Sequence, residues 1–549
     1  MSEPAAAGLR PVPTLAGLDM GRPEIEVGSG PEAIRELARH VGAGKHLPET
    51  YVTDGRVVHV QTVSGSATAA GIGEDAPLPM ASAALTPAGL ARLLAEHTIT
   101  YRRRARRTAA GGVEFFNEEY TPPASVLAAV LASTHWPDLP PLYRIVGAPV
   151  LRPRTGTLLQ RPGYDEATGL YLAARVGLPP IPDRPTAEQV AAARAFLLDV
   201  FLADFPWVSD ADRANYLALM VTPILRPYLR CLAPFGVVTA TMPASGKTIL
   251  TAGVGMLYGQ RVLTWTDNDD ELRKAITAVL ADPVGAVVFD NLPEGAVITS
   301  PVLARLITEQ TWADRRLGTN TTATLPNDRL WLATGNNLSV GGDMATRSVL
   351  VQLDPDMPRP EERTGFAIPN LDTWILDPAN QAEVLRHLLV LVLDWTAAGA
   401  PRAKGVPMRQ FTTWTEALGG LLAHHGIGGL LGNAATVRDV DEDAATWGAF
   451  LRRWTEQYPT GRWLTAAELR QSAETVTTDT GTSADPWMGT FPTTDRGGQV
   501  SAKSLGRLLR GQVGRWRDDY VLRAHRDPHT KINTYSVEYG RSRPGDHRE

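Results

Sequence analysis

The sequence predicts an α/β fold in which helices cover a mostly parallel sheet, and three observations lead to this prediction. Short apolar segments alternate with helical ones in the middle of the chain. The segment 285–291, GAVVFDN, is apolar almost throughout, which is typical of a strand buried on both faces. The segment 269–281, DDELRKAITAVLA, repeats apolar residues at three- and four-residue spacing, as an amphipathic helix does. Strands that alternate with helices in this way favour parallel pairing.

The composition is that of an ordinary globular chain. With 549 residues, 43% hydrophobic and 21% charged, it is long enough for several domains. A net charge of -5 means that any contact with nucleic acid must rest on local patches. Cys231 is the single cysteine, which excludes an internal disulfide framework and a cysteine-based metal cluster. No leader segment is evident and the longest apolar run, 388–393, is too short to span a bilayer, so we expect a cytoplasmic protein with no membrane partner.

Four parts follow one another along the chain. Residues 1–185 are rich in Pro and Gly and contain short β-like runs such as 51–63, so we expect a mixed α+β region there. Residues 186–375 begin with two helical segments and continue into the strands and helices of the sheet. Residues 376–439 contain apolar helices that we expect to form a helical lid. Residues 440–549 are expected to form a separate small unit.

The stretch 237–253, VVTATMPASGKTILTAG, ends an apolar strand and opens a helix in the manner of a phosphate-binding P-loop. The motif G-x-x-x-x-G-K-[ST] requires glycine where this chain has Thr241, and Ala244 stands where many such loops have a further glycine. Backbone amides at the helix N-terminus, the Lys247 ammonium and the Thr248 hydroxyl can bind the phosphates and Mg²⁺, so we expect ATP and Mg²⁺ as cofactors. The expected nucleotide contacts are Pro243, Ala244, Ser245, Gly246, Lys247, Thr248 and Ile249.

Two later strands end in polar side chains that suit the same site. Asp290 ends the segment 285–291 and can hold Mg²⁺ together with Thr248. The segment 329–337, RLWLATGNN, ends in amides, and Asn336 can hold the attacking water or the γ-phosphate because an amide both donates and accepts hydrogen bonds. For each strand taken alone, a simple turn at its end is the alternative.

The chain resembles the AAA+ replicative helicase module of phages, plasmids and integrated mobile elements. That family is related to the superfamily-three and minichromosome-maintenance-like helicases and is often fused to a primase. The resemblance extends over roughly residues 115–435. It rests on the succession MPASGKT (242–248), VVFDN (287–291), WADRRLG (312–318), LPNDRLWLATGNN (325–337) and GGDMATRSVLVQLD (341–354).

The resemblance implies a ring-forming ATPase, a homo-hexamer, that drives single-stranded DNA through its pore. Residues 1–185 would then be collar-like, and residues 186–375 would hold the P-loop AAA+ core. In such rings a neighbouring subunit donates an arginine to the nucleotide, and Arg315 and Arg347 match the motif arginines. Relatives tend to have two adjacent arginines where this chain has Thr346 and Arg347, so the division between trans and cis roles stays open.

Three further positions match the family pattern or depart from it. Glu271 and Lys274 match it, although no chemical step is assigned to them. Asn291 follows Asp290 where many AAA+ ATPases place a catalytic glutamate. An amide cannot act as a base, so activation of water must rest on Asp290, on another carboxylate, or on positioning alone.

The C-terminal unit has the pattern of a winged helix. A capping box, Thr465 with Glu468, starts one helix, and a second helix follows in the segment 501–516. A hairpin is expected over 520–540. Residues 501–549 carry eleven Lys or Arg against six Asp or Glu, which favours contact with duplex DNA, while a protein-contact module is the alternative. The residues expected to bind DNA are Lys503, Arg507 and Arg510.

Two other clusters leave alternatives open. The run YRRRARR, 101–107, could contact nucleic acid or form a solvated edge. His424 and His425 lie among leucines beside a glycine, and helix packing or a cap is favoured there over metal ligation.

The function expected from these observations is that of an ATP-dependent DNA helicase for replication of a phage, plasmid or integrated mobile element. The first alternative is an ATP-binding DNA initiator or switch that does not unwind DNA. The second is a P-loop phosphotransferase. The segment 1–185 shows no evident paired-carboxylate primase signature, so we do not infer a priming activity.

Overall fold

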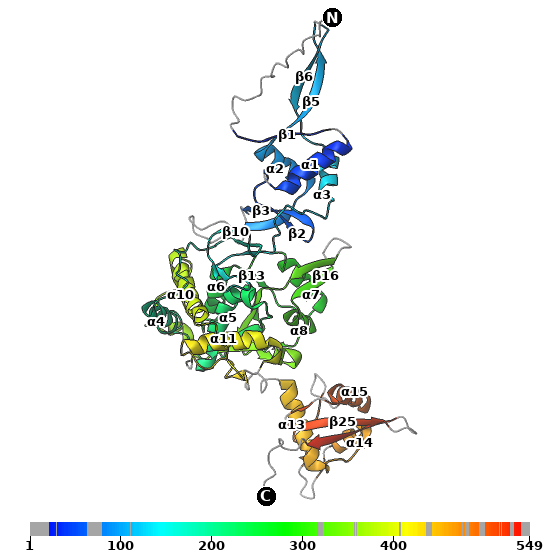
Figure 1. Ribbon diagram of the computed structural model, residues 1–549. Helices are drawn as coiled ribbons and strands as arrows, with labels where there is room; N and C mark the ends of the chain where they lie inside the picture. The colour runs from blue at the N-terminus through cyan, green and yellow to red at the C-terminus, as the bar shows by residue number, and fades with distance from the viewer. Residues whose placement is uncertain are drawn as a thin grey trace.

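The structure is a computed structural model in which the chain is elongated (Figure 1). An N-terminal unit, a large central unit and a C-terminal unit follow one another along it in Figure 1. The structure describes residues 21–28, 30–44, 46–62, 80–109, 111–315, 322–355, 357, 359–405, 408–434, 442–474, 476–477, 483–493, 500–514, 516–517, 519–526 and 532–539. Among these residues, no helix is both long enough and apolar enough to cross a bilayer.

The N-terminal unit combines small sheets with helices that share one apolar cluster. Strand β1 (Glu24–Glu26) pairs in parallel with β5 (Ile99–Arg107), which pairs antiparallel with β6 (Val113–Glu119). Strands β2, β3 and β4 form an antiparallel sheet, and α3 packs against both α1 and α2. The bounds are α1 (Pro31–Ala43), β2 (Thr50–Thr53), β3 (Arg56–Thr62), β4 (Met80–Ala84), α2 (Pro87–His97) and α3 (Ala124–Leu131).

Five short strands join this unit to the central one. Strand β11 pairs with β10 and β7, β8 pairs with β9, and β8 packs against helix α5 of the central unit. The bounds are β7 (Arg144–Val146), β8 (Val150–Leu151), β9 (Leu158–Leu159), β10 (Gly163–Asp165) and β11 (Leu170–Leu172).

The central unit is built on a five-stranded sheet in which every pairing is parallel. The order across the sheet is β13-β14-β18-β12-β20, so β12 lies inside and all its residues are buried. This arrangement confirms the α/β fold with a parallel sheet. The bounds are β12 (Phe235–Ala240), β13 (Gln260–Leu263), β14 (Ala286–Leu292), β18 (Leu330–Asn336) and β20 (Ser348–Leu353).

Helices surround this sheet. Helix α4 begins with a capping box between Thr186 and Gln189, and the chain continues as a π-helical turn, Phe196–Phe201. Helix α5 packs against β18 and β20, and α6 packs against β12, β13, β14 and β18. Helix α10 packs against α4, and α11 against α5. The bounds are α4 (Ala187–Ala195), α5 (Asp210–Leu229), α6 (Lys247–Tyr258), α7 (Asp269–Val279), α8 (Pro301–Thr308), α9 (Leu371–Trp374), α10 (Pro378–Ala397) and α11 (Thr412–His424).

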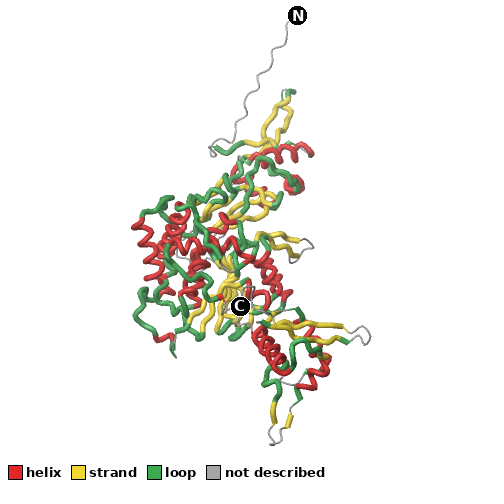
Figure 2. The backbone as a smooth tube through the Cα atoms, turned by 60° about the horizontal axis from the view of Figure 1, so that its bottom comes forward, coloured by secondary structure: helices red, strands yellow, loops and turns green. Residues whose placement is uncertain are grey.

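Two small strand pairs lie outside the large sheet. Strand β15 (Val297–Ile298) pairs with β19 (Ser339–Val340). Strands β16 (Thr311–Arg315) and β17 (Thr322–Pro326) form an antiparallel hairpin. Figures 1 and 2 show that this hairpin projects from the side of the central unit.

The C-terminal unit packs three helices against an antiparallel sheet of order β21-β26-β25-β24. The capping box is present: the Thr465 hydroxyl accepts from the Glu468 backbone N–H and the Glu468 carboxylate accepts from the Thr465 N–H. Leu505 and Leu509 are buried, whereas Leu508, which the helical pattern also assigns to the apolar face, is exposed. The bounds are α13 (Glu442–Gln457), β21 (Leu464–Thr465), α14 (Ala466–Ser472), β22 (Val476–Thr477), β23 (Ser483–Ala484), α15 (Ala502–Gln512), β24 (Trp516–Arg517), β25 (Tyr520–Arg526) and β26 (Asn533–Tyr539).

Three arginines, two buried and one partly buried, tie the connecting strands to the sheet. Arg144 on β7 pairs with Asp328 just before β18, Nε to Oδ2 at 2.9 Å, and Arg329 pairs with the same carboxylate. Arg226 on α5 donates to the Asn327 carbonyl at 2.7 Å. Burial lowers the pKa values of Arg144 and Arg226 to about 10. These guanidinium groups therefore remain charged at neutral pH, and Asp328 offsets part of their charge.

We expect Asp328→Asn to lower the free energy of unfolding by about 3 kcal/mol, because it leaves buried guanidinium groups without their carboxylate. Urea unfolding followed by circular dichroism measures this change. Asp210→Asn is the matched control: its side chain is 86% exposed beside Arg213, and we expect a change below about 0.5 kcal/mol. Equal effects of the two substitutions would contradict the stabilising role of Asp328 beside these arginines.

Candidate functional site

The loop between β12 and α6 has the sharp turns that the P-loop motif requires. Gly246 caps the N-terminus of α6 with φ +94°, and Ala244 also has a positive φ, +57°. A Cβ added to Gly246 would lie 3.0 Å from the Phe205 ring, so both backbone geometry and space require glycine there. The buried Ser245 hydroxyl donates to the Met242 carbonyl at 2.6 Å and closes the loop on itself.

The two departures from the P-loop motif have different structural consequences. Thr241 does not have a positive φ, and its hydroxyl donates to Asp354 Oδ1, at the end of β20, at 2.9 Å. The Thr241 side chain therefore fits at this position and has a hydrogen-bond partner in Asp354. Ala244 lies in the left-handed region, where an L-residue costs about 1 kcal/mol, so this is the position at which the loop carries strain.

Lys247 and Asn336 lie together at the carboxyl edge of the sheet. Ala240, the last residue of β12, is paired with Asn336 on β18. The Lys247 ammonium donates to Asn336 Oδ1 at 2.6 Å and to the Met242 carbonyl at 3.2 Å. Burial lowers the pKa of Lys247. The predicted phosphate-binding lysine and the predicted terminal amide thus form one site.

Asp290 is positioned by an irregular end of β14. Between the pairs Phe289–Ala333 and Leu292–Gly335, two residues of β14 lie opposite Thr334 alone, which forms a β-bulge. The Thr334 hydroxyl donates to Asp290 Oδ1 at 2.5 Å and accepts from the Asn291 N–H at 2.9 Å. Thr334, which sequence reasoning missed, therefore fixes the direction of the carboxylate.

Glu294 is a second carboxylate beside the loop that sequence reasoning missed. The Asn337 side-chain amide donates to Glu294 Oε1 at 3.2 Å, and its backbone N–H donates to the Ala240 carbonyl at 2.9 Å. Gly295, with φ +70°, donates its N–H to the Asn336 carbonyl at 3.0 Å, which holds this turn against the end of β18. The sequence signal that could have indicated Glu294 is the short turn-like segment LPEG, 292–295, directly after Asp290 and Asn291.

A cleft of about 430 Å³ opens beside the loop. Ala244, Ser245, Gly246 and Ile249 line it from the loop and α6. The opposite wall comes from segments far away in the sequence: Val200, Phe201, Asp204, Phe205, Pro206, Pro360, Glu361, Arg363, Phe366, Ile368, Asn370, Leu371 and Asp372. Sequence reasoning missed this wall, because its residues share no motif with the loop.

The remaining predicted contacts of the loop are open to solvent. Pro243 and Thr248 are exposed, and Thr248 is in the first turn of α6. The Thr248 hydroxyl and the Asp290 carboxylate are hard oxygen donors of the kind that Mg²⁺ prefers. The donor chemistry of this chain therefore fits Mg²⁺, with Asp290 already oriented by Thr334.

The two predicted motif arginines lie on different elements. Arg315 is exposed at the end of β16, and its backbone N–H donates to Asp314 Oδ1 at 2.7 Å. Arg347 is largely buried: it donates to the Ala304 carbonyl at 2.8 Å and to Gln410 Oε1 at 3.1 Å. Within one chain neither arginine hydrogen-bonds to the side chains described above at the loop.

Glu271 and Lys274 on α7 form an exposed ion pair with each other at 2.6 Å. In the arginine run, strand pairing places Arg102 and Arg104 against Glu118, at 2.6 and 2.8 Å. Arg106 similarly pairs with Glu114 at 2.9 Å. Two glutamates on β6 therefore offset part of the charge of the five arginines in this run, and both interpretations of the run stay open.

His424 and His425 end α11. His425 is buried, its Nε2 lies 2.9 Å from the Leu391 carbonyl, and burial lowers its pKa. Arg194 on α4 donates to the His425 carbonyl at 3.0 Å. His425 thus contributes to the packing of the end of α11 against α10 and α4.

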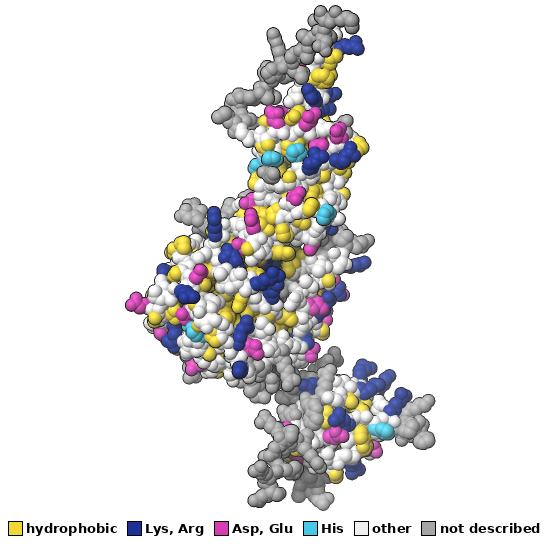
Figure 3. All heavy atoms as spheres, in the orientation of Figure 1, with side chains coloured by type: hydrophobic (Ala, Val, Ile, Leu, Met, Phe, Trp, Pro, Cys, Tyr) yellow, Lys and Arg dark blue, Asp and Glu magenta, His cyan; other side chains and the backbone are white. Residues whose placement is uncertain are grey.

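The predicted DNA-binding residues share one exposed face of α15. Lys503, Arg507 and Arg510 are all exposed, while Leu505 and Leu509 turn into the core. Figure 3 shows Lys and Arg side chains gathered over the part of the C-terminal unit where Figure 1 places α15.

Comparison with known proteins gives structural neighbours of low similarity. No protein-family model and no curated protein sequence matches the chain. The NrS-1 C-terminal region is 12% identical, with 83% of this chain and 100% of that chain covered and a TM-score of 0.34. JCV helicase bound to a small molecule is 17% identical, with 46% and 73% covered and a TM-score of 0.22. SCCmec type IV Cch, described as an active helicase, is 13% identical, with 68% and 73% covered and a TM-score of 0.27.

We expect Gly246→Ala to lower the free energy of unfolding by about 1 to 3 kcal/mol, because alanine meets both an unfavourable φ and the Phe205 ring. Gly177→Ala is the control, since its φ is not in the left-handed region and a Cβ there meets open space. We expect that change to stay within about 1 kcal/mol of wild type. Chemical denaturation curves measure both, and a neutral Gly246→Ala would contradict the steric argument.

Proposed function

We propose that the chain is an ATP-dependent DNA helicase of the AAA+ type that acts in the replication of a phage, plasmid or integrated mobile element. One observation carries the proposal. Lys247 is the first residue of α6, which follows β12 and its loop, whereas Asn336 ends β18 and the oriented Asp290 lies near the end of β14, at one edge of a parallel sheet. A lysine at a helix N-terminus with a carboxylate and an amide opposite it is suited to phosphoryl transfer from a bound nucleoside triphosphate.

The nucleotide fits the loop and the neighbouring cleft together. Backbone amides at the start of α6 and the Lys247 ammonium would bind the phosphates. The nucleoside would occupy the cleft, whose lining includes Phe205 and Phe366. Arg363 lies over the Phe366 ring, 5.3 Å from its centroid, and donates to the Asp204 carbonyl at 2.6 Å, so this wall is held in place by its own contacts.

Hydrolysis requires a water attack on the γ-phosphorus and cleavage of the bond to the bridging oxygen, with release of ADP and phosphate. Mg²⁺ held by Thr248 and Asp290 would supply charge neutralisation. Asn336 would orient the water, and a carboxylate would accept its proton. Asn291 cannot accept it, so Asp290 or Glu294 would take this role, or the water would be activated by positioning alone.

The arginine that completes the site would come from a neighbouring subunit of a homo-hexamer. Arg315 is exposed on a projecting hairpin, which suits a role toward a neighbour. Arg347 would first have to leave the Ala304 carbonyl, Gln410 and its ion pair with Asp343. Arg315 is therefore the better candidate for the role in trans.

The C-terminal unit would bind duplex DNA as a winged helix. Its helices α13, α14 and α15 precede the hairpin of β25 and β26, and the basic face of α15 is exposed. In this arrangement the helix would contact DNA phosphates and the hairpin would lie beside them. Single-stranded DNA would pass through the pore of the ring, with the N-terminal unit as a collar and α10 and α11 as the lid.

We expect Lys247→Ala to reduce DNA-stimulated ATP hydrolysis by roughly 100-fold or more, because the ammonium that neutralises the phosphates is removed. Phosphate release, displacement of a labelled strand and gel filtration with ATP are measured on the full chain. Lys404→Ala is the matched control, an exposed lysine outside the site, and we expect it to behave as wild type.

The outcomes separate the alternatives. Normal ATP hydrolysis by Lys247→Ala would contradict the assignment of the nucleotide site to this loop. Hydrolysis by the wild type without strand displacement, or ATP binding without hydrolysis, would identify an initiator or switch. Hydrolysis by a monomer that transfers phosphate to an acceptor would identify a phosphotransferase.

We expect replacement of Lys503, Arg507 and Arg510 by alanine to weaken binding of duplex DNA and to reduce the slope of log affinity against log salt by about 2 to 3. Fluorescence anisotropy over a salt series measures this. The control removes equal charge elsewhere, at Arg39, Arg92 and Arg359, each paired with a glutamate of its own turn. An unchanged slope in the first variant would favour a protein-contact role for the C-terminal unit.

A further inference from the structure

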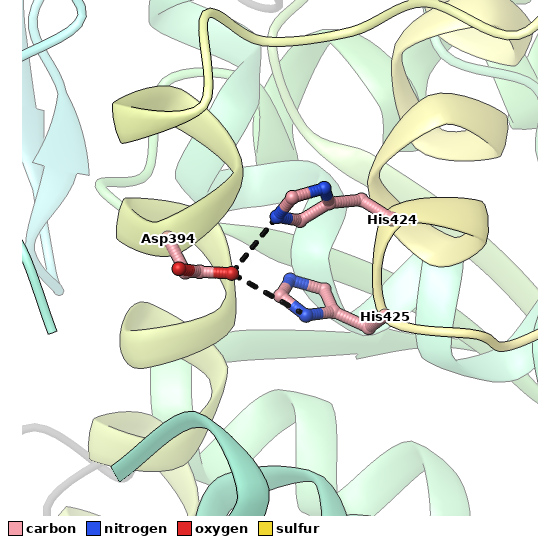
Figure 4. Close-up of side chains that lie close together, drawn as sticks. All are labelled: Asp394, His424 and His425. Atoms are coloured by element: carbon pink, nitrogen blue, oxygen red, sulfur yellow. Dashed lines mark hydrogen bonds and ion pairs between the residues drawn. The ribbon is translucent and has the colours of Figure 1, made fainter. Parts of the chain in front are cut away.

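Three side chains converge between α10 and α11, away from the nucleotide site. Asp394 comes from α10, and His424 and His425 come from the end of α11 (Figure 4). One carboxylate oxygen, Asp394 Oδ2, lies 2.9 Å from His424 Nε2 and 3.8 Å from His425 Nδ1. The three ligand atoms all lie within 4.8 Å of one another.

The hydrogen bond at the other side of His425 fixes the tautomer of this ring. Its Nε2 lies 2.9 Å from the Leu391 carbonyl oxygen, which can only accept, so Nε2 carries the proton. In the neutral ring Nδ1 therefore has a lone pair, and this lone pair faces the Asp394 carboxylate. A cation placed between these two electron-rich atoms would be stabilised by both of them.

We propose that Asp394, His424 and His425 form a binding site for a zinc-type divalent transition metal. A tetrahedral zinc with bonds of about 2.0 to 2.1 Å places its ligand atoms about 3.3 Å apart, and the two observed separations, 2.9 and 3.8 Å, lie on either side of this value. The Leu391 carbonyl is the kind of outer partner that orients a metal-bound histidine. Two imidazoles favour zinc over Mg²⁺, which prefers oxygen ligands.

The site would join α10 to α11 and leave one coordination position for water. The Asp394 side chain is 29% exposed and that of His424 is 27% exposed, so an ion can enter from solvent. Beyond His425 the chain is fastened to α5, where Leu431 donates to Asn215 and Asn433 donates to Asp212. A bound metal would thus stiffen the end of α11, from which the chain continues toward the C-terminal unit.

The test uses the full chain after removal of metal with a chelator. Isothermal titration with zinc chloride, the visible absorption of added Co²⁺, and thermal unfolding with and without zinc are measured without nucleotide. We expect one zinc per chain, a Co²⁺ spectrum typical of tetrahedral coordination, and a higher melting temperature with zinc.

Asp394→Asn and His424→Asn should each weaken zinc binding at least tenfold and remove the zinc-dependent rise in melting temperature. Both positions are partly exposed, and circular dichroism in the chelator verifies that the variants fold. His387→Asn is the matched control, a histidine of α10 that packs against Phe196 outside the cluster, and it should keep both effects. Absence of stoichiometric zinc binding in the wild type, or equal binding by all variants, would overturn the proposal.

Discussion

Parallel pairing of β12 with β18 and β20 is the constraint on which the candidate site depends. Parallel strands end at the same edge of a sheet, so the residues that follow them meet whatever their separation in the sequence. Lys247 and Asn336 are 89 residues apart and yet share a hydrogen bond. The same edge brings Asp354, at the end of β20, to Thr241 and so provides a partner for the side chain that replaces a glycine. The strand order thus explains both the site and its tolerance of an unusual loop.

Local patterns in the sequence predicted helices and strands. The details of the candidate site depend on contacts between residues far apart in the sequence. The apolar run 285–291 predicted a buried strand because its signal lies within one segment. The bulge at Asp290 depends on Thr334, which lies on another strand, and no local pattern indicates it. The wall of the cleft with Phe366 was missed for the same reason. Leu508 followed the helical period and is nevertheless exposed, because a period shows which residues share a face but not how wide the covered face is.

Positive charge in this chain is mostly arginine, and much of it is engaged in holding the fold together. Arg144 fastens the connecting strands to the sheet, and Arg102 and Arg104 stabilise an antiparallel ribbon through Glu118. A planar guanidinium suits these roles because it makes several hydrogen bonds in fixed directions. A count of basic residues therefore overestimates the surface available to nucleic acid. The exposed basic face of α15 is a better candidate for such a surface than the denser arginine run 101–107.

If phosphate binds at the loop as proposed, the Asn336 amide competes with it for the Lys247 ammonium. The ammonium would then exchange the amide for phosphate oxygens. Part of the binding free energy would be used to break the hydrogen bond, and the amide would be released. By thermodynamic linkage, any interaction that strengthens this bond weakens ligand affinity by the same factor. The amide at the end of β18 would therefore have a different hydrogen-bond partner when the loop is filled than when it is empty.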